Sequence, residues 1–224
     1  MSAFGQRTPA RRRVGTRKTH TRVLVICGGV ETEPRYLRYV GDRLGASGVK
    51  IETVPDGRDL TSLVRMARDR REAERKQAAA TNDARNTYDA VWVMADVDDY
   101  GAQVLGALQE AIRAGVEVAL SNPCFELWLL WHVGDCGRFV TTREAQVLAK
   151  KAGVVGGRKD KMPMSARLQG GFVGAEARSR RLRKCHESNG SLPPTDNPSS
   201  RVDVLVRSLI EAETHARSGF EHGL

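Results

Sequence analysis

Acidic side chains follow three short apolar runs of the chain, and their positions suit the binding of a divalent cation. Glu31 and Glu33 follow the first run, Asp96 and Asp98 a second, and Glu126 a third. Alternate residues of an extended segment point to the same side, so Asp96 and Asp98 can share one cation. Carboxylate oxygens favour Mg²⁺ or Mn²⁺ over zinc. A metal held in this way could activate water for phosphodiester hydrolysis.

Two other interpretations, one of the acidic residues and one of the cysteines and histidines, remain open. The acidic segment around Asp96 could be a turn in which Asp99 caps the next helix. A zinc site could also be drawn from the side chains of Cys124, His132, Cys136 and His186. Their spacing matches no closed zinc module, and the chain has no C-x-x-C pair. The four cysteines therefore indicate free thiols in a reducing compartment.

The elements that must position these side chains alternate along the chain. Four strands are predicted, at 22–27, 49–54, 88–95 and 116–120. The segment at 49–54 alternates between apolar and polar residues, and the other three are short, mainly apolar runs. Helical patterns follow each of the four strands. In the helix that follows the fourth predicted strand, Ser121 or Asn122 caps the N-terminus and Pro123 occupies the first turn. Right-handed βαβ units then give an α/β fold with a mostly parallel sheet of about four strands flanked by helices. The acidic residues fall at the carboxyl ends of its strands, where open parallel sheets bind ligands.

The remaining sequence predicts a helical C-terminal extension and little independent structure before the first strand. We expect a disordered basic arm at 1–21, an α/β core at 22–135, a basic helical extension at 136–187, a linker rich in Pro, Ser and Asn at 188–200, and a terminal helix at 201–216. In the region after the fourth strand, Trp128 and Trp131 are expected to pack in the core, and His132 to lie in the core or cap the helix.

Positive charge is concentrated at the N-terminus. The net charge is +9, but seven basic and no acidic residues lie in 1–22, so the remaining 29 basic residues nearly balance 27 acidic ones. Such an arm suits contact with nucleic-acid phosphates, although it could also be a solvated tail. A second basic cluster could bind a nucleic-acid backbone or a protein partner, or form a solvated helix face. It consists of Arg178, Arg180, Arg181, Arg183 and Lys184. The predicted nucleic-acid contacts are Arg11, Arg12, Arg13, Arg17, Lys18, Arg180, Arg181, Arg183 and Lys184.

The apolar content and the N-terminal sequence indicate in which compartment the protein is expected. Apolar residues make up 40% of the chain, and none of their runs approaches the roughly 20 residues that a membrane span requires. The N-terminus is polar and basic, which differs from a secretory signal peptide. We expect a cytoplasmic protein without membrane contact.

Four segments of the chain resemble motifs of the RloB-like family in the same order. These segments are VICGGVETEPRYL at 25–37, VMADVD at 93–98, ALSNPCFELWLLWH at 119–132 and NPSSRV at 197–202. The resemblance covers about residues 22 to 212. It implies a Toprim-like fold and a role in bacterial phage defence, in which members act as metal-dependent nucleases beside an ATPase partner.

The resemblance also implies a site and shows one departure from it. Asp96 and Asp98 match the metal-binding pair, and Glu33 or Glu126 would complete a catalytic set with Mg²⁺ or Mn²⁺. The Toprim pattern places a glutamate at the end of its first strand, where this chain has Gly28. Loss of that glutamate leaves a second possibility, in which the protein is a catalytically degenerate module that binds nucleic acid or a partner.

Overall fold

The computed structural model describes residues 20–45, 48–97 and 101–221. The central sheet has the strand order β2-β1-β3-β4-β7. Its strands are β1 (Thr21–Cys27), β2 (Val49–Pro55), β3 (Ala90–Asp96), β4 (Glu117–Asn122) and β7 (Ser199–Ser200). Strands β1, β2, β3 and β4 are parallel to one another, as predicted. Strand β7 is antiparallel to β4. The predicted α/β architecture is therefore confirmed, with one short strand added at the edge.

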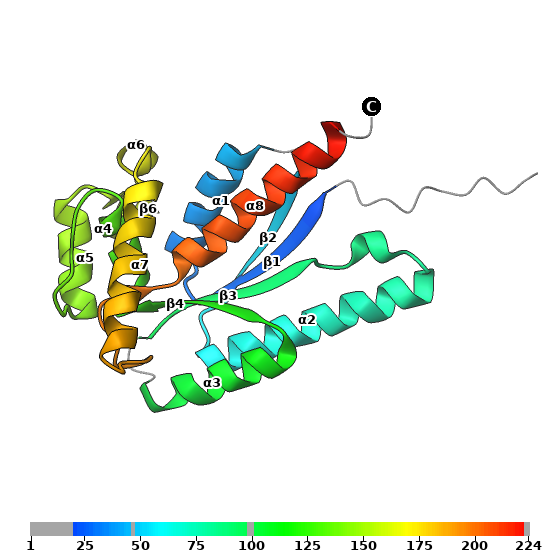
Figure 1. Ribbon diagram of the computed structural model, residues 1–224, viewed down its shortest axis with the longest axis horizontal. Helices are drawn as coiled ribbons and strands as arrows, with labels where there is room; N and C mark the ends of the chain where they lie inside the picture. The colour runs from blue at the N-terminus through cyan, green and yellow to red at the C-terminus, as the bar shows by residue number, and fades with distance from the viewer. Residues whose placement is uncertain (1–19, 46–47, 98–100, 222–224) are drawn as a thin grey trace, which may run out of the picture.

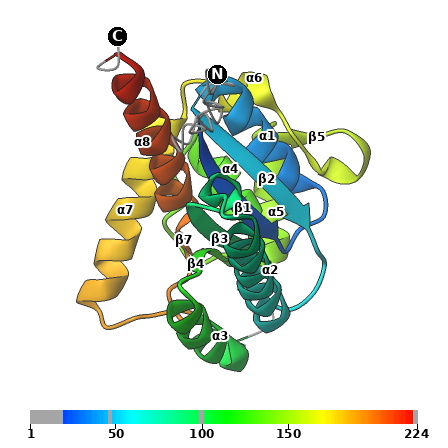
Figure 2. The ribbon, with the colours of Figure 1, turned by 90° about the vertical axis from the view of Figure 1, so that its right-hand side faces the viewer.

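Helices cover both faces of this sheet (Figures 1 and 2). Helices α2 (Leu60–Thr81) and α3 (Gly101–Ala114) lie together on one face, and α1 (Thr32–Leu44) and α8 (Val202–Glu221) lie on the other. The remaining elements lie toward the carboxyl ends of the strands, at the left in Figure 1. They are α4 (Phe125–Trp131), α5 (Thr142–Lys151), β5 (Val155–Gly156), β6 (Met162–Pro163), α6 (Ser165–Leu168) and α7 (Phe172–Ser188). Two 3-10 turns, η1 (Ala84–Asn86) and η2 (Arg158–Asp160), complete the described fold.

Alternation along the strands separates two apolar layers. In β3, Trp92 and Met94 face the layer that contains α1, α4 and α8, whereas Val91 and Val93 face the layer that contains α2 and α3. Because successive side chains of a strand point to opposite faces, Asp96 belongs to the face of Trp92 and Met94. The carboxylate at the end of β3 is thus on the side of α1 and α4.

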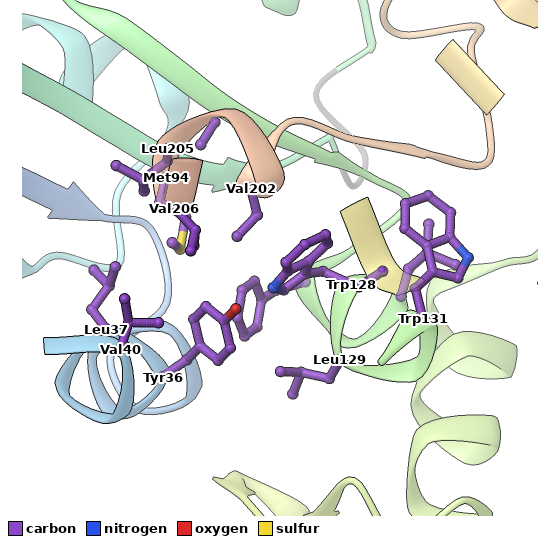
Figure 3. Packing of buried hydrophobic residues seen from close by; sticks show 14 of the residues in the cluster. Tyr36, Leu37, Val40, Met94, Trp128, Leu129, Trp131, Val202, Leu205 and Val206 are labelled. Carbon is purple, nitrogen blue, oxygen red and sulfur yellow. The ribbon is translucent and has the colours of Figure 1, made fainter. Parts of the chain in front are cut away.

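Aromatic side chains join α1 to α4 within the first layer (Figure 3). Tyr36 of α1 is 1% exposed and points toward Trp128 of α4, with ring centroids 6.4 Å apart. Phe125 meets the same tyrosine ring edge-on at 5.4 Å. Trp128, Trp131 and His132 are all buried, which confirms the core role predicted for them. Packing of this kind fixes α4, and therefore Glu126, relative to α1.

Several helix ends follow the sequence rules. The Asp59 carboxylate accepts a hydrogen bond from the Ser62 backbone N–H at 3.0 Å and caps α2. Thr141 and Glu144 form a capping box at the start of α5.

The prediction for the start of α4 was wrong. Ser121 and Asn122 pair with β7 as part of β4, so neither caps the helix, and Pro123 precedes it. The helix begins at Phe125, with Cys124 at the N-cap position. Partners far along the chain account for the difference, because the Asn122 side chain donates to the Pro194 carbonyl and to Asp196, both at 2.9 Å.

The described residues bear on two further predictions, that the cysteines are free thiols and that no segment spans a membrane. Cys27, Cys124, Cys136 and Cys185 are free thiols, and the first three are buried. In the described part of the chain, no helix combines the length and the apolar character needed to cross a membrane.

His132 should make the protein less stable in acid. Its Nδ1 donates to the Trp128 carbonyl at 3.0 Å, and burial lowers the pKa of the imidazole to about 4, below the ordinary value of about 6.5. The unfolded chain therefore binds the proton more readily, and the stability present above pH 6.5 is lost as the pH falls toward 4. Between pH 7.5 and 5 we expect the native protein to lose about 2 kcal/mol through this group.

A His132→Gln variant isolates this effect. Glu33 and other titrating groups remain in both proteins and cancel in the comparison. Urea unfolding at pH 7.5 and pH 5 should show that the destabilisation caused by the substitution is about 2 kcal/mol smaller at pH 5. Equal destabilisation at both pH values would contradict a neutral buried His132.

Candidate functional site

The predicted acidic residues lie at one edge of the sheet. Asp96 is the last residue of β3 and is in register with Ser121 of β4. Glu33 lies in the first turn of α1, after β1, and Glu126 lies in the first turn of α4, after β4. Asp98 and Asp99 lie outside the described residues. The parallel topology thus brings three separate segments to the carboxyl ends of β1, β3 and β4.

Glu33 is held against the loop that follows β1. Its side chain is buried, and Oε1 accepts a hydrogen bond from the Gly29 backbone N–H at 3.0 Å. Burial raises the pKa of Glu33 to about 7, and the Glu126 charge acts in the same direction, whereas the Gly29 N–H and Lys161 act against the rise. Glu33 is therefore able to gain or lose a proton near neutral pH.

Gly29 is required for this position of Glu33. A Cβ atom on Gly29 would overlap the Glu33 carboxylate, so any larger residue would displace the acid. The position of the Glu33 carboxylate therefore depends on the absence of a side chain at residue 29. The sequence pattern alone did not indicate this dependence.

Glu126 is paired with a cation that the sequence analysis missed. Lys161 Nζ donates to Glu126 Oε1 at 3.1 Å, and the two side chains are 39% and 6% exposed. Burial opposes the charge on Lys161, but Glu126 and Asp96 outweigh burial, so the pKa of the ammonium lies above its ordinary value. Lys161 is the counter-charge of the buried glutamate.

Asp96 shares an electrostatic environment with Glu126. Burial raises the pKa of the Cys124 thiol far above its usual range, and the charges of Asp96 and Glu126 raise it further. The same two acids raise the pKa of Lys161. Asp96, Glu126, Cys124 and Lys161 therefore form one charged neighbourhood, which extends to Glu33 through its coupling to Glu126 and Lys161. We refer to Glu33, Asp96 and Glu126 as the acid cluster.

Gly28 is directed away from this cluster. Its backbone N–H donates to the Met94 carbonyl at 2.8 Å, which extends the pairing of β1 with β3 by one residue. A Cβ atom on Gly28 would lie 3.3 Å from Leu63 Cδ1 of α2 and 3.5 Å from Ala95. A glutamate at this position would leave the backbone on the α2 side of the sheet, whereas Asp96 is on the α1 side.

The residues present suit a magnesium ion by chemistry but do not form a complete protein cage. Within residues 20–45, 48–97 and 101–221, no group of three or more His, Cys, Asp or Glu side chains could hold a metal ion. The zinc site considered above, from Cys124, His132, Cys136 and His186, is therefore not formed. Mg²⁺ is usually bound by only one or two carboxylates and keeps several waters. Asp96 together with Asp98 would satisfy that need, with Glu126 already engaged by Lys161.

The second basic cluster is largely paired with acids. Arg180 bonds Glu176 at 3.1 Å, and Arg181 bonds Asp135 at 3.4 Å, both as exposed guanidinium groups. Lys184 is exposed. Arg183 differs, because it forms a bidentate pair with Asp203, whose side chain is 3% exposed. The predicted contacts in the arm, namely Arg11, Arg12, Arg13, Arg17 and Lys18, lie outside the described residues.

One comparison with known proteins gives a match. A family model described as "RloB-like protein" matches residues 23–209. No curated protein and no solved structure is significantly similar to the chain. The matched region begins in β1 and ends within α8, so it contains every described residue of the acid cluster, and Lys161.

Proposed function

Because the chain belongs to the RloB-like protein family, we propose that it is a Mg²⁺-dependent or Mn²⁺-dependent nuclease that acts on phosphodiesters in bacterial phage defence. The observation that carries the proposal is the convergence of Glu33, Asp96 and Glu126 on the carboxyl ends of three adjacent parallel strands. Ligands of open parallel sheets bind at this edge.

Each acid has a distinct proposed role. Asp96 and Asp98 would hold the metal, which when bound supplies an activated water and offsets charge on the phosphoryl oxygens. Glu33, whose pKa is about 7, is suited to accept a proton near neutral pH. Glu126 holds Lys161 at the site through their 3.1 Å hydrogen bond. The chain thus offers a proton acceptor and a positioned cation for the proposed metal site.

The basic segments would bind the nucleic-acid backbone. We assign this role to the arm and to Arg180, Arg181 and Lys184, which are exposed on α7. Arg183 is left out of this surface because Asp203 and the Ser200 carbonyl already hold it. An ATPase partner from the same defence locus, as the family resemblance implies, would act together with the chain.

A second function is favoured by one observation. Gly28 has no side chain where Toprim enzymes carry a glutamate, and its Cβ direction is toward Leu63 rather than the acid cluster. In this alternative the chain binds nucleic acid or its partner and does not cut. The presence or absence of cleavage separates the two functions.

A cleavage assay tests the proposal. Labelled single-stranded and double-stranded DNA and RNA are incubated with the full chain, with and without the partner ATPase, in Mg²⁺, Mn²⁺ or EDTA. We expect cleavage with either metal, none in EDTA, and loss of cleavage in Asp96→Asn, because that variant removes a ligand charge without changing side-chain size.

Asp42→Asn is the matched control, since Asp42 is an exposed acid of α1 outside the acid cluster. It should cut like the native protein. Binding of nucleic acid without cleavage in any metal would overturn the nuclease proposal and favour the binding module.

A further inference from the structure

Strand β2 forms an outer edge of the central sheet, and its outer side has no strand partner among the described residues. It is the first strand in the order β2-β1-β3-β4-β7, and it is hydrogen-bonded to β1. Figure 2 shows it at the outer side of the sheet, beyond β1. Such an edge presents unpaired backbone N–H and C=O groups, with which another extended segment can pair. The strand has the sequence VKIETVP, so its proline stands at the last position and leaves the rest of the strand open to pairing.

The hydrogen bonds to β1 show which backbone groups of β2 face outward. Just before the strand, the Gly48 carbonyl accepts from the Thr21 N–H at 2.8 Å. Just after it, the Asp56 N–H donates to the Cys27 carbonyl at 2.8 Å. Successive residues of a strand direct their backbone groups to opposite sides, so the even-numbered residues face β1 and the odd-numbered residues face the free edge. The outward-facing residues are Val49, Ile51 and Thr53.

Charges of both signs lie on one face of this edge. Lys50 is exposed, and Glu52 points to the same face two residues later. The Glu52 carboxylate accepts hydrogen bonds from Arg70 at 3.3 Å and from the Tyr88 hydroxyl at 2.8 Å. Arg22 lies 3.6 Å from it. These contacts fix the carboxylate at the edge, while the Glu52 side chain remains 38% exposed and open to a further cation.

We propose that the β2 edge pairs with the β2 edge of a second copy, and that the two chains form a two-fold dimer with one continuous sheet. In an arrangement centred on Ile51, this residue lies opposite its own equivalent and Val49 lies opposite Thr53. All three are outward-facing, so each pair exchanges backbone hydrogen bonds. Antiparallel pairing turns the carboxyl ends of the strands of the two copies in opposite directions, and the inference does not depend on the proposed metal site.

The charges of β2 favour this arrangement over its neighbours. Centred on Ile51, the pairing places Lys50 of each copy opposite Glu52 of the other, at positions whose Cα atoms are ~4.5 Å apart. Opposite charges at such positions stabilise a sheet, and like charges destabilise it. Centring the pairing on Lys50 or on Glu52 would instead place like charges opposite each other. The edge is thus complementary to itself, which identifies a second copy as its partner.

A groove beside the edge can receive side chains of the second copy. It has a volume of about 950 Å³ and lies between β2 and α1. Ile51 and Thr53 line it and are half-buried, so each has apolar surface left to cover. Gly41 of α1 adds no side chain to this groove. The Ile51 and Thr53 side chains of the second copy point to the same side of the sheet and would gain apolar burial there.

Sedimentation velocity of the full chain over a wide range of concentrations tests the proposal. The native protein should form dimers. Lys50→Glu or Glu52→Lys alone places like charges opposite each other and should raise the dissociation constant about tenfold. An equimolar mixture of these two variants should recover the native value, because the acids of one copy then face the lysines of the other. Lys76→Glu makes the same change of charge at an exposed position of α2 and should behave like the native protein.

Thr53→Pro tests the backbone pairing separately from the charges. It removes an outward N–H and leaves the hydrogen bonds to β1 intact, so the folded variant should be a monomer. Circular dichroism checks that each variant folds. If Glu52→Lys unfolds, Lys50→Glu and Thr53→Pro still carry the test.

Each outcome decides for or against the dimer. Dimers in the native protein, weakened in each charge variant and recovered in their mixture, support the proposal. A native protein that stays monomeric at every concentration overturns it, and protection of the Ile51 amide from hydrogen exchange in that monomer would assign the edge to another segment of the same chain. Dimers that persist unchanged in Thr53→Pro also overturn it, because they must form through another surface. Failure of the mixture to associate overturns the pairing of Lys50 with Glu52.

Discussion

Asp203→Ala is expected to destabilise the folded protein by about 3–5 kcal/mol, the usual cost of breaking a buried ion pair by removing one partner. Asp203 lies at the start of α8 and is 2% exposed. Its two oxygens accept hydrogen bonds from Arg183 Nη1 and Nη2 at 2.6 and 2.7 Å, and Oδ1 also accepts from Ser179 Oγ at 3.0 Å. The substitution would leave the Arg183 guanidinium partly buried, with only neutral acceptors.

Urea unfolding followed by circular dichroism measures this cost. Glu211→Ala is the matched control, because it removes an exposed acid from the same helix and should change stability by less than about 0.5 kcal/mol. A double variant, Asp203→Leu with Arg183→Met, removes both charges and should be more stable than Asp203→Ala alone. A cost for Asp203→Ala no larger than that of the control would contradict a structural role for this pair.

The ion pair also shows what the sequence could not reveal about the basic cluster. Arg180, Arg181, Arg183 and Lys184 look alike as a run of charges, yet it is Arg183 that pairs with the buried Asp203 of α8. The choice of partner depends on how α7 packs against α8, which no local pattern encodes. Arg183 therefore stabilises the packing of α7 against α8. The proposed backbone contacts are left to Lys184 and to Arg180 and Arg181, whose ion pairs are exposed.

The parallel sheet was predictable because β1 and β3 are continuous apolar runs and β2 alternates between apolar and polar residues. The side chains of β1 and β3 alternate between two apolar layers, which explains why both faces of these strands are apolar. Strand β7 was not predictable, because Ser199 and Ser200 are short polar residues in a Pro-rich segment. Their pairing with Asn122 and Ser121 arises from tertiary contacts. Because of the same contacts, α4 begins at Phe125 and not at Pro123.

The acid cluster was predictable only in part, for a similar reason. Glu33, Asp96 and Glu126 each follow a strand that the sequence predicts, so the topology rule indicated that they lie at one edge of the sheet. Lys161 has no such signal, since it lies in a glycine-rich and basic connection and reaches Glu126 through the anchoring of that connection to α1 and α5. The need for Gly29 beneath the Glu33 carboxylate likewise depends on the turn between β1 and α1.

In the proposed function, a divalent metal binds at this edge of the sheet through Asp96 and Asp98. A cation that binds only the folded state stabilises it by about 2.7 kcal/mol at a hundredfold excess over its dissociation constant. For a chain of this length, that corresponds to a rise in melting temperature of roughly 5–10 °C. Removing both ligand charges should abolish this gain, and relief of repulsion among the acids offsets part of any loss of stability without metal.

The most direct measurement compares the melting temperature with and without saturating Mg²⁺ in three proteins: the native chain, Asp96→Asn with Asp98→Asn, and a control with Asp42→Asn and Asp69→Asn. The control makes the same change of charge at two exposed helix positions. We expect the native protein and the control to gain the full increase and the Asp96 and Asp98 variant to gain almost none. An equal gain in all three proteins, or no gain in the native protein, would contradict the proposed metal site.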